Sequence, residues 1–238
     1  MVLVRYDNLK FIDRIFQFFN TTPIILLFAT IIVCYAASAP YFYHKYIGIF
    51  NATNITSLLF LDTYTFVFFF AIPLIVGKIF FDEEPVNLGL RWPINNKTAS
   101  RLIAFAICFV LPITLFCAQK TQFKSYYSFG ESSVAYFIFV QMTILPTYYF
   151  SEEFFFRGFL FLILWRKLNW HSFWITDIFF TLAHLGKPGL EIILSIPASI
   201  VLNYLTLRTK SILPAIIVHA TIGIMINTFV NYNLLKLL

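Results

Sequence analysis

Apolar residues run along the chain in long stretches that are separated by short polar segments. A helix needs about 20 mostly apolar residues to cross the hydrocarbon core of a membrane. The pattern therefore predicts an all-α fold, a polytopic transmembrane helix bundle with about seven spans. An amphipathic helix over residues 8–20 is expected to lie at the membrane interface before the first span. The expected spans are residues 23–43, 62–81, 98–118, 133–168, 172–185, 190–207 and 212–237.

The fourth of these stretches is too long for one straight crossing. Pro146 lies within it, and we expect a kink there because proline removes a backbone hydrogen bond from a helix. No repeat or linker divides the chain, so residues 1–238 are predicted to form a single integral membrane domain. Residues 133–227 hold the polar groups that interrupt apolar stretches, and this half is predicted to carry the function. The first three spans contain no recognisable motif.

Composition agrees with a membrane protein and excludes several other classes. Of the 238 residues, 60% are hydrophobic and only 12% are charged, whereas soluble domains carry roughly 25% charged residues. Such a composition does not fit a soluble domain, a disordered chain or a disulfide scaffold. The net charge of +6 does not indicate nucleic-acid binding either, because the basic residues lie between apolar runs and not along one face.

The positions of the basic residues predict the orientation in the membrane, since cytoplasmic loops carry an excess of Lys and Arg. With the N-terminus in the cytoplasm, eleven of the 17 fall inside: Arg5, Lys10, Arg14, Lys78, Arg91, Lys97, Arg101, Arg166, Lys167, Arg208 and Lys210. Five fall outside, namely Lys45, Lys120, Lys124, Lys187 and Lys236, while Arg157 lies within a span. This imbalance favours seven spans with a cytoplasmic N-terminus.

Ionisable residues at hydrocarbon depth are costly and are typical of functional sites. Those in the second half of the chain are Glu152, Glu153, Arg157, Asp177, His184 and His219. Glu153 and Arg157 are four residues apart, so their side chains can meet on one helix face and neutralise each other. Glu152 is rotated by about 100° from that face, so it is predicted to lack this partner.

Three of these groups come from three different spans and fall at related depths. Counting about 1.5 Å per residue, Glu152 lies about 21 Å, His184 about 20 Å and His219 about 10 Å from the cytoplasmic surface. Asp177 shares a face with His184, which indicates a hydrated cavity along this span. A glutamate and two histidines in such a cavity suit hydrolysis by activated water. The same groups could instead bridge helices through hydrogen bonds.

At these residues the sequence resembles the CAAX protease and bacteriocin-processing family of intramembrane glutamic endopeptidases, which includes the type II CAAX prenyl endopeptidase. The family motif EExxxR corresponds to residues 152–157, where it reads EEFFFR and is followed by Gly158. The motif FxxxH corresponds to residues 180–184, which read FTLAH. Residues 208–216 resemble the segment that leads into the third motif, whose histidine is His219.

The resemblance implies a role for each motif residue. Glu152 is the implied general base, His184 helps to orient the attacking water, and His219 stabilises the oxyanion. Glu153 and Arg157 hold the site together by their ion pair, and Phe180 packs beside His184. This mechanism needs no cofactor and no metal. Zinc held by a glutamate and two histidines is the alternative, although the sequence lacks HExxH spacing.

The third motif departs from the family pattern HxxxN. Gly223 stands where the asparagine is expected, so the side chain that would share the oxyanion hole is missing. Asn227, about 80° off the His219 face, and Asn203 on the preceding span are candidate replacements. Removing one oxyanion donor can lower the rate about 10²–10³-fold, so the departure bears directly on whether the chain is active.

The sequence thus favours an intramembrane, metal-independent glutamic endopeptidase that cleaves a peptide or a membrane-anchored protein. A non-enzymatic bacteriocin-immunity or peptide-binding protein on the same fold is the alternative. A small transporter is a third possibility, but the sequence shows no sign of the internal repeats that a transporter is expected to have. The expected partners are the substrate and membrane lipid, without nucleic acid. We expect a multi-pass protein of a bacterial cell membrane. The sequence determines neither the substrate nor the oligomeric state.

Overall fold

The computed structural model describes residues 31, 55–130 and 132–235, and the regular elements among them are helices. Five helical runs are long and apolar enough to cross a membrane: Ile55–Phe81, Asn96–Ala118, Val134–Leu168, Gly189–Thr209 and Leu213–Val230. The chain is therefore a multi-pass integral membrane protein with an all-α fold, as predicted. The expected interfacial helix at 8–20 and, apart from residue 31, the expected span at 23–43 lie outside the described residues.

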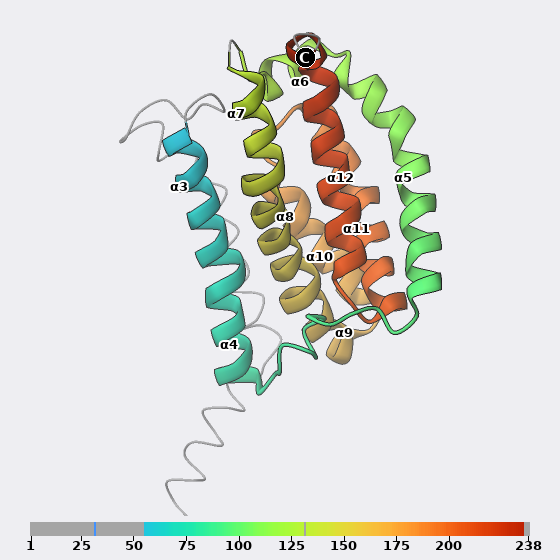
Figure 1. The fold of residues 1–238 in the computed structure, drawn as a ribbon. Coiled ribbons are helices and arrows are strands. Elements are labelled where there is room, and N and C mark those ends of the chain that lie inside the picture. Colours follow the sequence, from blue (N-terminus) through green and yellow to red (C-terminus); the bar gives the residue numbers. More distant parts are fainter. Residues whose placement is uncertain (1–30, 32–54, 131, 236–238) are drawn as a thin grey trace, which may run out of the picture.

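The helices follow one another as an antiparallel bundle (Figure 1). The first long run joins α3 (Ile55–Thr65), the π-helical η1 (Phe66–Ala71) and α4 (Ile72–Phe81), and α5 (Asn96–Ala118) and the short α6 (Thr121–Tyr127) come next. The run over Val134–Leu168 joins α7 (Val134–Phe139), the π-helical η2 (Val140–Ile144), α8 (Leu145–Glu153), the π-helical η3 (Phe154–Phe161) and α9 (Leu162–Leu168). The last elements are α10 (His171–Ala183), α11 (Gly189–Thr209), α12 (Leu213–Val230) and α13 (Tyr232–Leu235).

Cross-chain contacts define the two ends of the bundle. At the lower end in Figure 1, Arg166 pairs with Glu83, and the backbone N–H of Ile94 donates to the carbonyl of Thr209 at 3.1 Å. The C-termini of α4, α9 and α11 therefore lie together with the start of α5. At the upper end, the Asn231 side chain accepts from the N–H of Phe129 at 2.8 Å.

α10 is shorter than the predicted span at residues 172–185. Its 13 residues rise about 20 Å, less than the roughly 30 Å of a hydrocarbon core, and it is not among the five long apolar helices. The helix ends at Ala183, and Gly186, with a φ of +93°, and Pro188 lie in the segment that follows and does not continue it. α11 begins near the upper end, where Glu191 accepts from the Tyr127 hydroxyl at 2.6 Å, so residues 184–188 complete the traverse without helix.

The predicted disturbance at Pro146 takes the form of a π-helical segment. Pro146 lies in the first turn of α8, directly after η2. A prolyl ring inside a helix lacks the N–H and crowds the carbonyl four residues earlier, here that of Met142 within η2. A wider turn accommodates both defects, and the helix continues as one run to Leu168.

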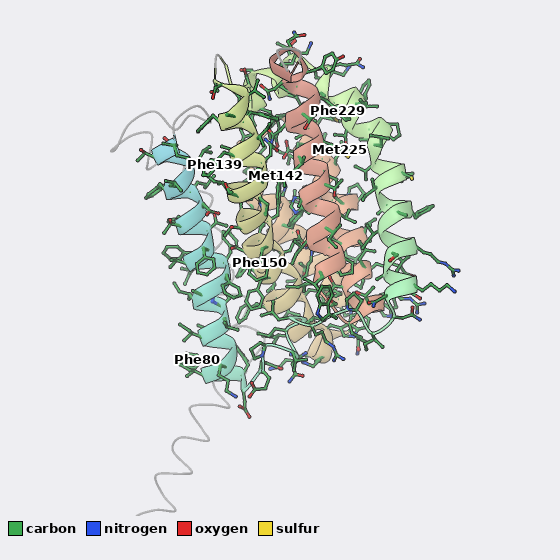
Figure 2. All side chains as sticks on the ribbon, viewed as in Figure 1. Phe80, Phe139, Met142, Phe150, Met225 and Phe229 are labelled. Atoms are coloured by element: carbon green, nitrogen blue, oxygen red, sulfur yellow. The ribbon has the colours of Figure 1, made fainter. Side chains whose placement is uncertain are left out.

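Phenylalanine side chains fill the core between the first and third long runs. Phe154, Phe155 and Phe156 are fully buried, and the rings of Phe69 and Phe155 meet edge to face at 4.9 Å. These residues pack in the core and do not face lipid. Other large apolar side chains cover the outer surface, such as Met142, which is 70% exposed (Figure 2). An apolar outer surface is what a lipid environment requires.

Candidate active site

Glu152 and Glu153 are the last two residues of α8 and lie near the middle of the long run Val134–Leu168. Both are buried, Glu152 at 4% exposure and Glu153 at 0%. The π-helical η3 begins immediately after them. Segments of this kind occur frequently at functional sites because they change the direction in which neighbouring side chains project.

Glu153 and Arg157 form the ion pair that their spacing predicts. The Nε of Arg157 donates to Oε2 of Glu153 at 3.0 Å, and both side chains are fully buried. Arg157 also donates from Nη1 to the Ser199 hydroxyl of α11 at 3.2 Å. Its guanidinium lies over the ring of Phe180, 4.3 Å from the centroid. The pair therefore ties η3 to both α10 and α11.

Glu153 has a second partner that sequence spacing did not reveal. Its Oε1 is 2.7 Å from Nδ1 of His219, on α12. A carboxylate can only accept, so Nδ1 carries a proton in this hydrogen bond. The two residues are 66 positions apart in the chain, and no periodicity connects them. Glu153 thus orients His219 while it neutralises Arg157.

His184 lies at the residue that caps the C-terminal end of α10 and is buried. Its Nδ1 is 2.8 Å from the carbonyl oxygen of Phe180. Because a carbonyl oxygen can only accept, Nδ1 is the donor, and Nε2 of the neutral ring is left as an acceptor. The rings of His184 and His219 are 6.5 Å apart. Phe180 contacts both, at 4.5 Å from His184 and 5.7 Å from His219.

Glu152 differs from its neighbour in having an unsatisfied oxygen. Its Oε2 is buried and has no hydrogen-bond partner among the described residues. A buried polar atom without a partner is costly and is typical of a catalytic group or a ligand site. Of the two adjacent carboxylates, Glu152 is therefore the one available to a water molecule or a substrate.

The space beside Gly223 is filled by Tyr149, which sequence reasoning missed. A Cβ built on Gly223 would overlap the Tyr149 hydroxyl and lie 2.8 Å from its Cε2. The Tyr149 ring also packs against His219, with 4.7 Å between the ring centroids. No pattern in the sequence pairs these residues, because Tyr149 belongs to α8 and Gly223 to α12.

The other polar residues predicted for the site occupy different surroundings. Asn203 donates from Nδ2 to Asp177 Oδ1 at 3.2 Å, which links α11 to α10. One N–H of its amide is therefore engaged with Asp177. Asn227 is buried on α12, eight residues beyond His219 and thus about 12 Å along the helix axis. Among the described residues, there is no group of three or more His, Cys, Asp or Glu side chains that could hold a metal ion.

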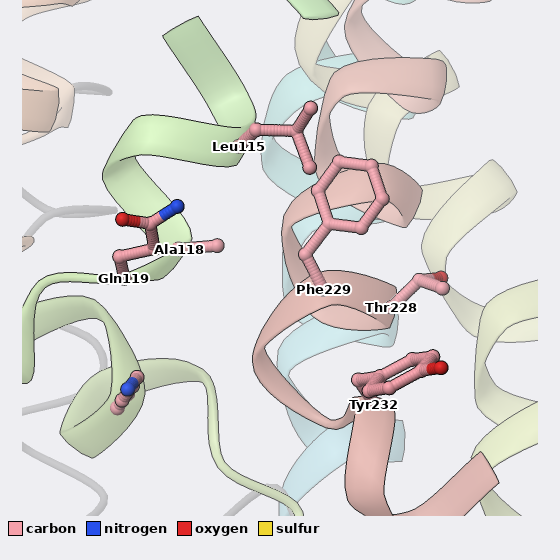
Figure 3. A pocket seen from close by; sticks show the side chains of 7 residues that line it. Leu115, Ala118, Gln119, Thr228, Phe229 and Tyr232 are labelled. Atoms are coloured by element: carbon pink, nitrogen blue, oxygen red, sulfur yellow. The ribbon is translucent and has the colours of Figure 1, made fainter. Parts of the chain in front are cut away.

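A cavity of about 740 Å³ opens elsewhere, between the upper ends of α5 and α12 (Figure 3). Its lining includes Leu115 from α5 and Phe229 from α12. Another lining residue, Thr228, is nine residues beyond His219, so about 13 Å separates the cavity from that histidine along α12. The cavity is therefore distinct from the cluster of glutamates and histidines inside the bundle.

Glu153, His219 and His184 come together inside the bundle from three helices, and this arrangement defines an integral membrane protein with an internal polar site. Residues 131–225 match the family model of the Rce1-like type II CAAX prenyl endopeptidases. The match covers the segment that carries the three motifs and confirms the resemblance drawn from them, and the matched family is one of membrane proteases. Neither the curated proteins nor the solved structures contain a significant match to the chain.

Proposed function

We propose that this protein is a metal-independent intramembrane endopeptidase whose nucleophile is a water molecule activated by Glu152. The observation that carries the proposal is the difference between two adjacent buried carboxylates. Glu153 is engaged by Arg157 and His219, whereas Oε2 of Glu152 has no partner among the described residues. Of these two carboxylates, Glu152 is therefore the one available to take a proton from water.

The two histidines support different steps of this reaction. Nε2 of His184 is an acceptor in the neutral ring, so it can hold one hydrogen of the attacking water while Glu152 removes the other. His219 donates from Nδ1 to the Glu153 carboxylate, and in the doubly protonated ring Nε2–H can donate to the carbonyl oxygen as that oxygen gains negative charge. Glu152 then returns its proton to the leaving amine.

The proposed substrate is a peptide or a membrane-anchored protein, as the family suggests. The basic residues indicate that the lower end of the bundle faces the cytoplasm, with seven spans and a cytoplasmic N-terminus. The site would then lie within the membrane, where closely packed helices exclude bulk water. A substrate must therefore enter between helices or from one end of the bundle.

The test compares purified wild type with Glu152→Gln and His184→Ala in liposomes. The probe is an internally quenched farnesylated peptide with a C-terminal CAAX sequence, supported by a comparison of membrane-protein termini in cells that express each variant. We expect both substitutions to reduce cleavage at least about 10²-fold, because each removes a group that activates water. Glu84→Gln, which changes an exposed glutamate at the lower end, is the control and should cleave normally.

A binding protein without catalytic activity is the second candidate, and Gly223 in place of the motif asparagine is the observation that favours it. The Glu152→Gln variant separates the two functions. If it gives the same cleavage and the same termini as the wild type, Glu152 is not the base and the proposed mechanism is wrong. An unchanged thermal unfolding profile of the variant in detergent ensures that a loss of cleavage is not a loss of fold.

A further inference from the structure

Tyr149 is a near neighbour of both glutamates on the surface of α8. It precedes Glu152 by three residues and Glu153 by four, a spacing that places side chains on one helix face. Its ring packs on His219, with 4.7 Å between centroids, and the residue is only 8% exposed. The hydroxyl is thus carried into the interior beside the histidine that Glu153 orients.

Gly223, which has no side chain, leaves the space that this hydroxyl occupies. It follows His219 by four residues on α12, which is about one helical turn. A Cβ at this position would come closer than 3.0 Å to three atoms of Tyr149, a separation that real Cβ atoms essentially never show. The tyrosine hydroxyl therefore occupies the place that a side chain at position 223 would take, one turn from His219.

We propose that the Tyr149 hydroxyl is a catalytic hydrogen-bond donor that stabilises the oxyanion together with His219. The inference rests on the proposed function and names a residue that completes it. When water attacks the scissile carbonyl, its proton passes to Glu152 and the carbonyl oxygen gains the negative charge. Tyr149 donates a hydrogen bond to that oxygen and keeps its own proton, so the balance of the reaction is unchanged.

The structure favours Tyr149 over the two asparagines considered for this role. The Asn203 amide donates to Asp177, and Asn227 lies about two turns beyond His219. The Tyr149 side chain, in contrast, packs directly against the His219 ring. A hydroxyl, like an amide, can supply the donor that an oxyanion needs.

The first test is Tyr149→Phe, which removes the hydroxyl and keeps the ring that packs on His219. We expect kcat for the farnesylated peptide to fall about 10²–10³-fold with little change in KM, because the donor acts only on the charge that develops in the transition state. Tyr148→Phe, which removes a hydroxyl from the adjacent residue, should leave kcat unchanged. The thermal unfolding of both variants should match that of the wild type.

The second test moves the donor from one helix to the other. Gly223→Asn alone should inactivate the enzyme, since the new side chain collides with Tyr149. Tyr149→Ala clears that space and also removes the donor, so it should lower kcat. The double variant Tyr149→Ala/Gly223→Asn places an amide where the hydroxyl was, and we expect it to recover at least tenfold in kcat over Tyr149→Ala. A tyrosine that serves only for packing would not give this recovery.

The outcomes distinguish this inference from the proposed function. If Tyr149→Phe retains the kcat of the wild type while Glu152→Gln is inactive, the role of Tyr149 is refuted and the endopeptidase mechanism stands. If the double variant and Tyr149→Ala are both folded and the double variant has no higher kcat, this result also counts against the inference. Wild-type cleavage by Glu152→Gln, or no cleavage of the peptide and no changed termini with the wild type, overturns both proposals.

Discussion

Glu152 and Glu153 are adjacent in the chain, yet the protein surrounds them differently. Helical spacing was sufficient to predict that Glu153 meets Arg157 and that Glu152 does not, and the 3.0 Å ion pair confirms the first part. The contact of Glu153 with His219 was not predictable, because it joins α8 to α12. Within the described residues, the Glu153 carboxylate therefore has a partner at each oxygen, and the difference between the two glutamates is larger than the sequence suggests.

We expect Glu153→Gln to destabilise the protein by about 3–5 kcal/mol, because removal of one partner leaves Arg157 as an uncompensated buried charge. The measurement is equilibrium unfolding in detergent. Adding Arg157→Met to this variant should cost less than the sum of the two single changes, with a coupling of at least about 1 kcal/mol. Strict additivity would show that the pair does not hold the site together. Glu84→Gln, at an exposed pair with Lys78, should have no measurable effect.

At the scale of helices, the close approach of η3 to the segment after α4 depends on Gly158. A Cβ on Gly158 would lie 2.6 Å from the backbone carbonyl oxygen of Leu88, and a backbone atom cannot rotate away as a side chain can. Leu88 is itself fully buried. The glycine that follows the first motif in the sequence is therefore a packing requirement, which lets the helix that carries the glutamates lie against this loop.

Gly158→Ala should lower the free energy of unfolding by about 1–3 kcal/mol, as expected when a methyl group is forced into a filled space. Gly189→Ala is the matched control, since nothing lies within 4 Å of the Cβ that it adds. It lies at the start of α11 and should be neutral or slightly stabilising. Equal effects of the two substitutions, measured by thermal unfolding in detergent, would contradict the packing argument.

The ends of helices were the least predictable elements. The apolar run at 172–185 predicts a span, but the helix ends at Ala183, before the left-handed Gly186. This early end has a consequence for the site. His184 caps the helix inside the bundle, and its Nδ1 bonds to the Phe180 carbonyl, which is left without a normal helical partner at a C-terminus. Where a helix stops therefore determines the orientation of one of the proposed catalytic side chains.

For the whole molecule, the two ends of the bundle differ in charge. The lower end carries Lys78, Arg91, Lys97, Arg101, Arg166, Lys167, Arg208 and Lys210, whereas the described residues of the upper end contribute Lys120, Lys124 and Lys187. The excess of Lys and Arg that was counted along the sequence is therefore found at one end of the folded bundle. By the positive-inside rule, we expect the lower end to face the cytoplasm.

Cysteine labelling tests this orientation in intact cells. Trp92, which is 81% exposed at the lower end, and Lys124, exposed at the upper end, are replaced by cysteine one at a time after Cys34, Cys108 and Cys117 are changed to alanine. A membrane-impermeant maleimide should label Lys124→Cys from outside and Trp92→Cys only after the membrane is opened. The reverse pattern would invert the predicted topology.

The sequence alone determined the class of the protein, the positions of most long helices and the residues that carry the motifs. These features depend on local composition and spacing, because a lipid environment demands long apolar helices and a helix brings together residues four apart. Tertiary structure alone decided which groups from different helices meet. The contact of Glu153 with His219 and the position of the Tyr149 hydroxyl at Gly223 both depend on how α8 packs against α12, and that packing is set by shape and volume, which leave no periodic trace in the chain.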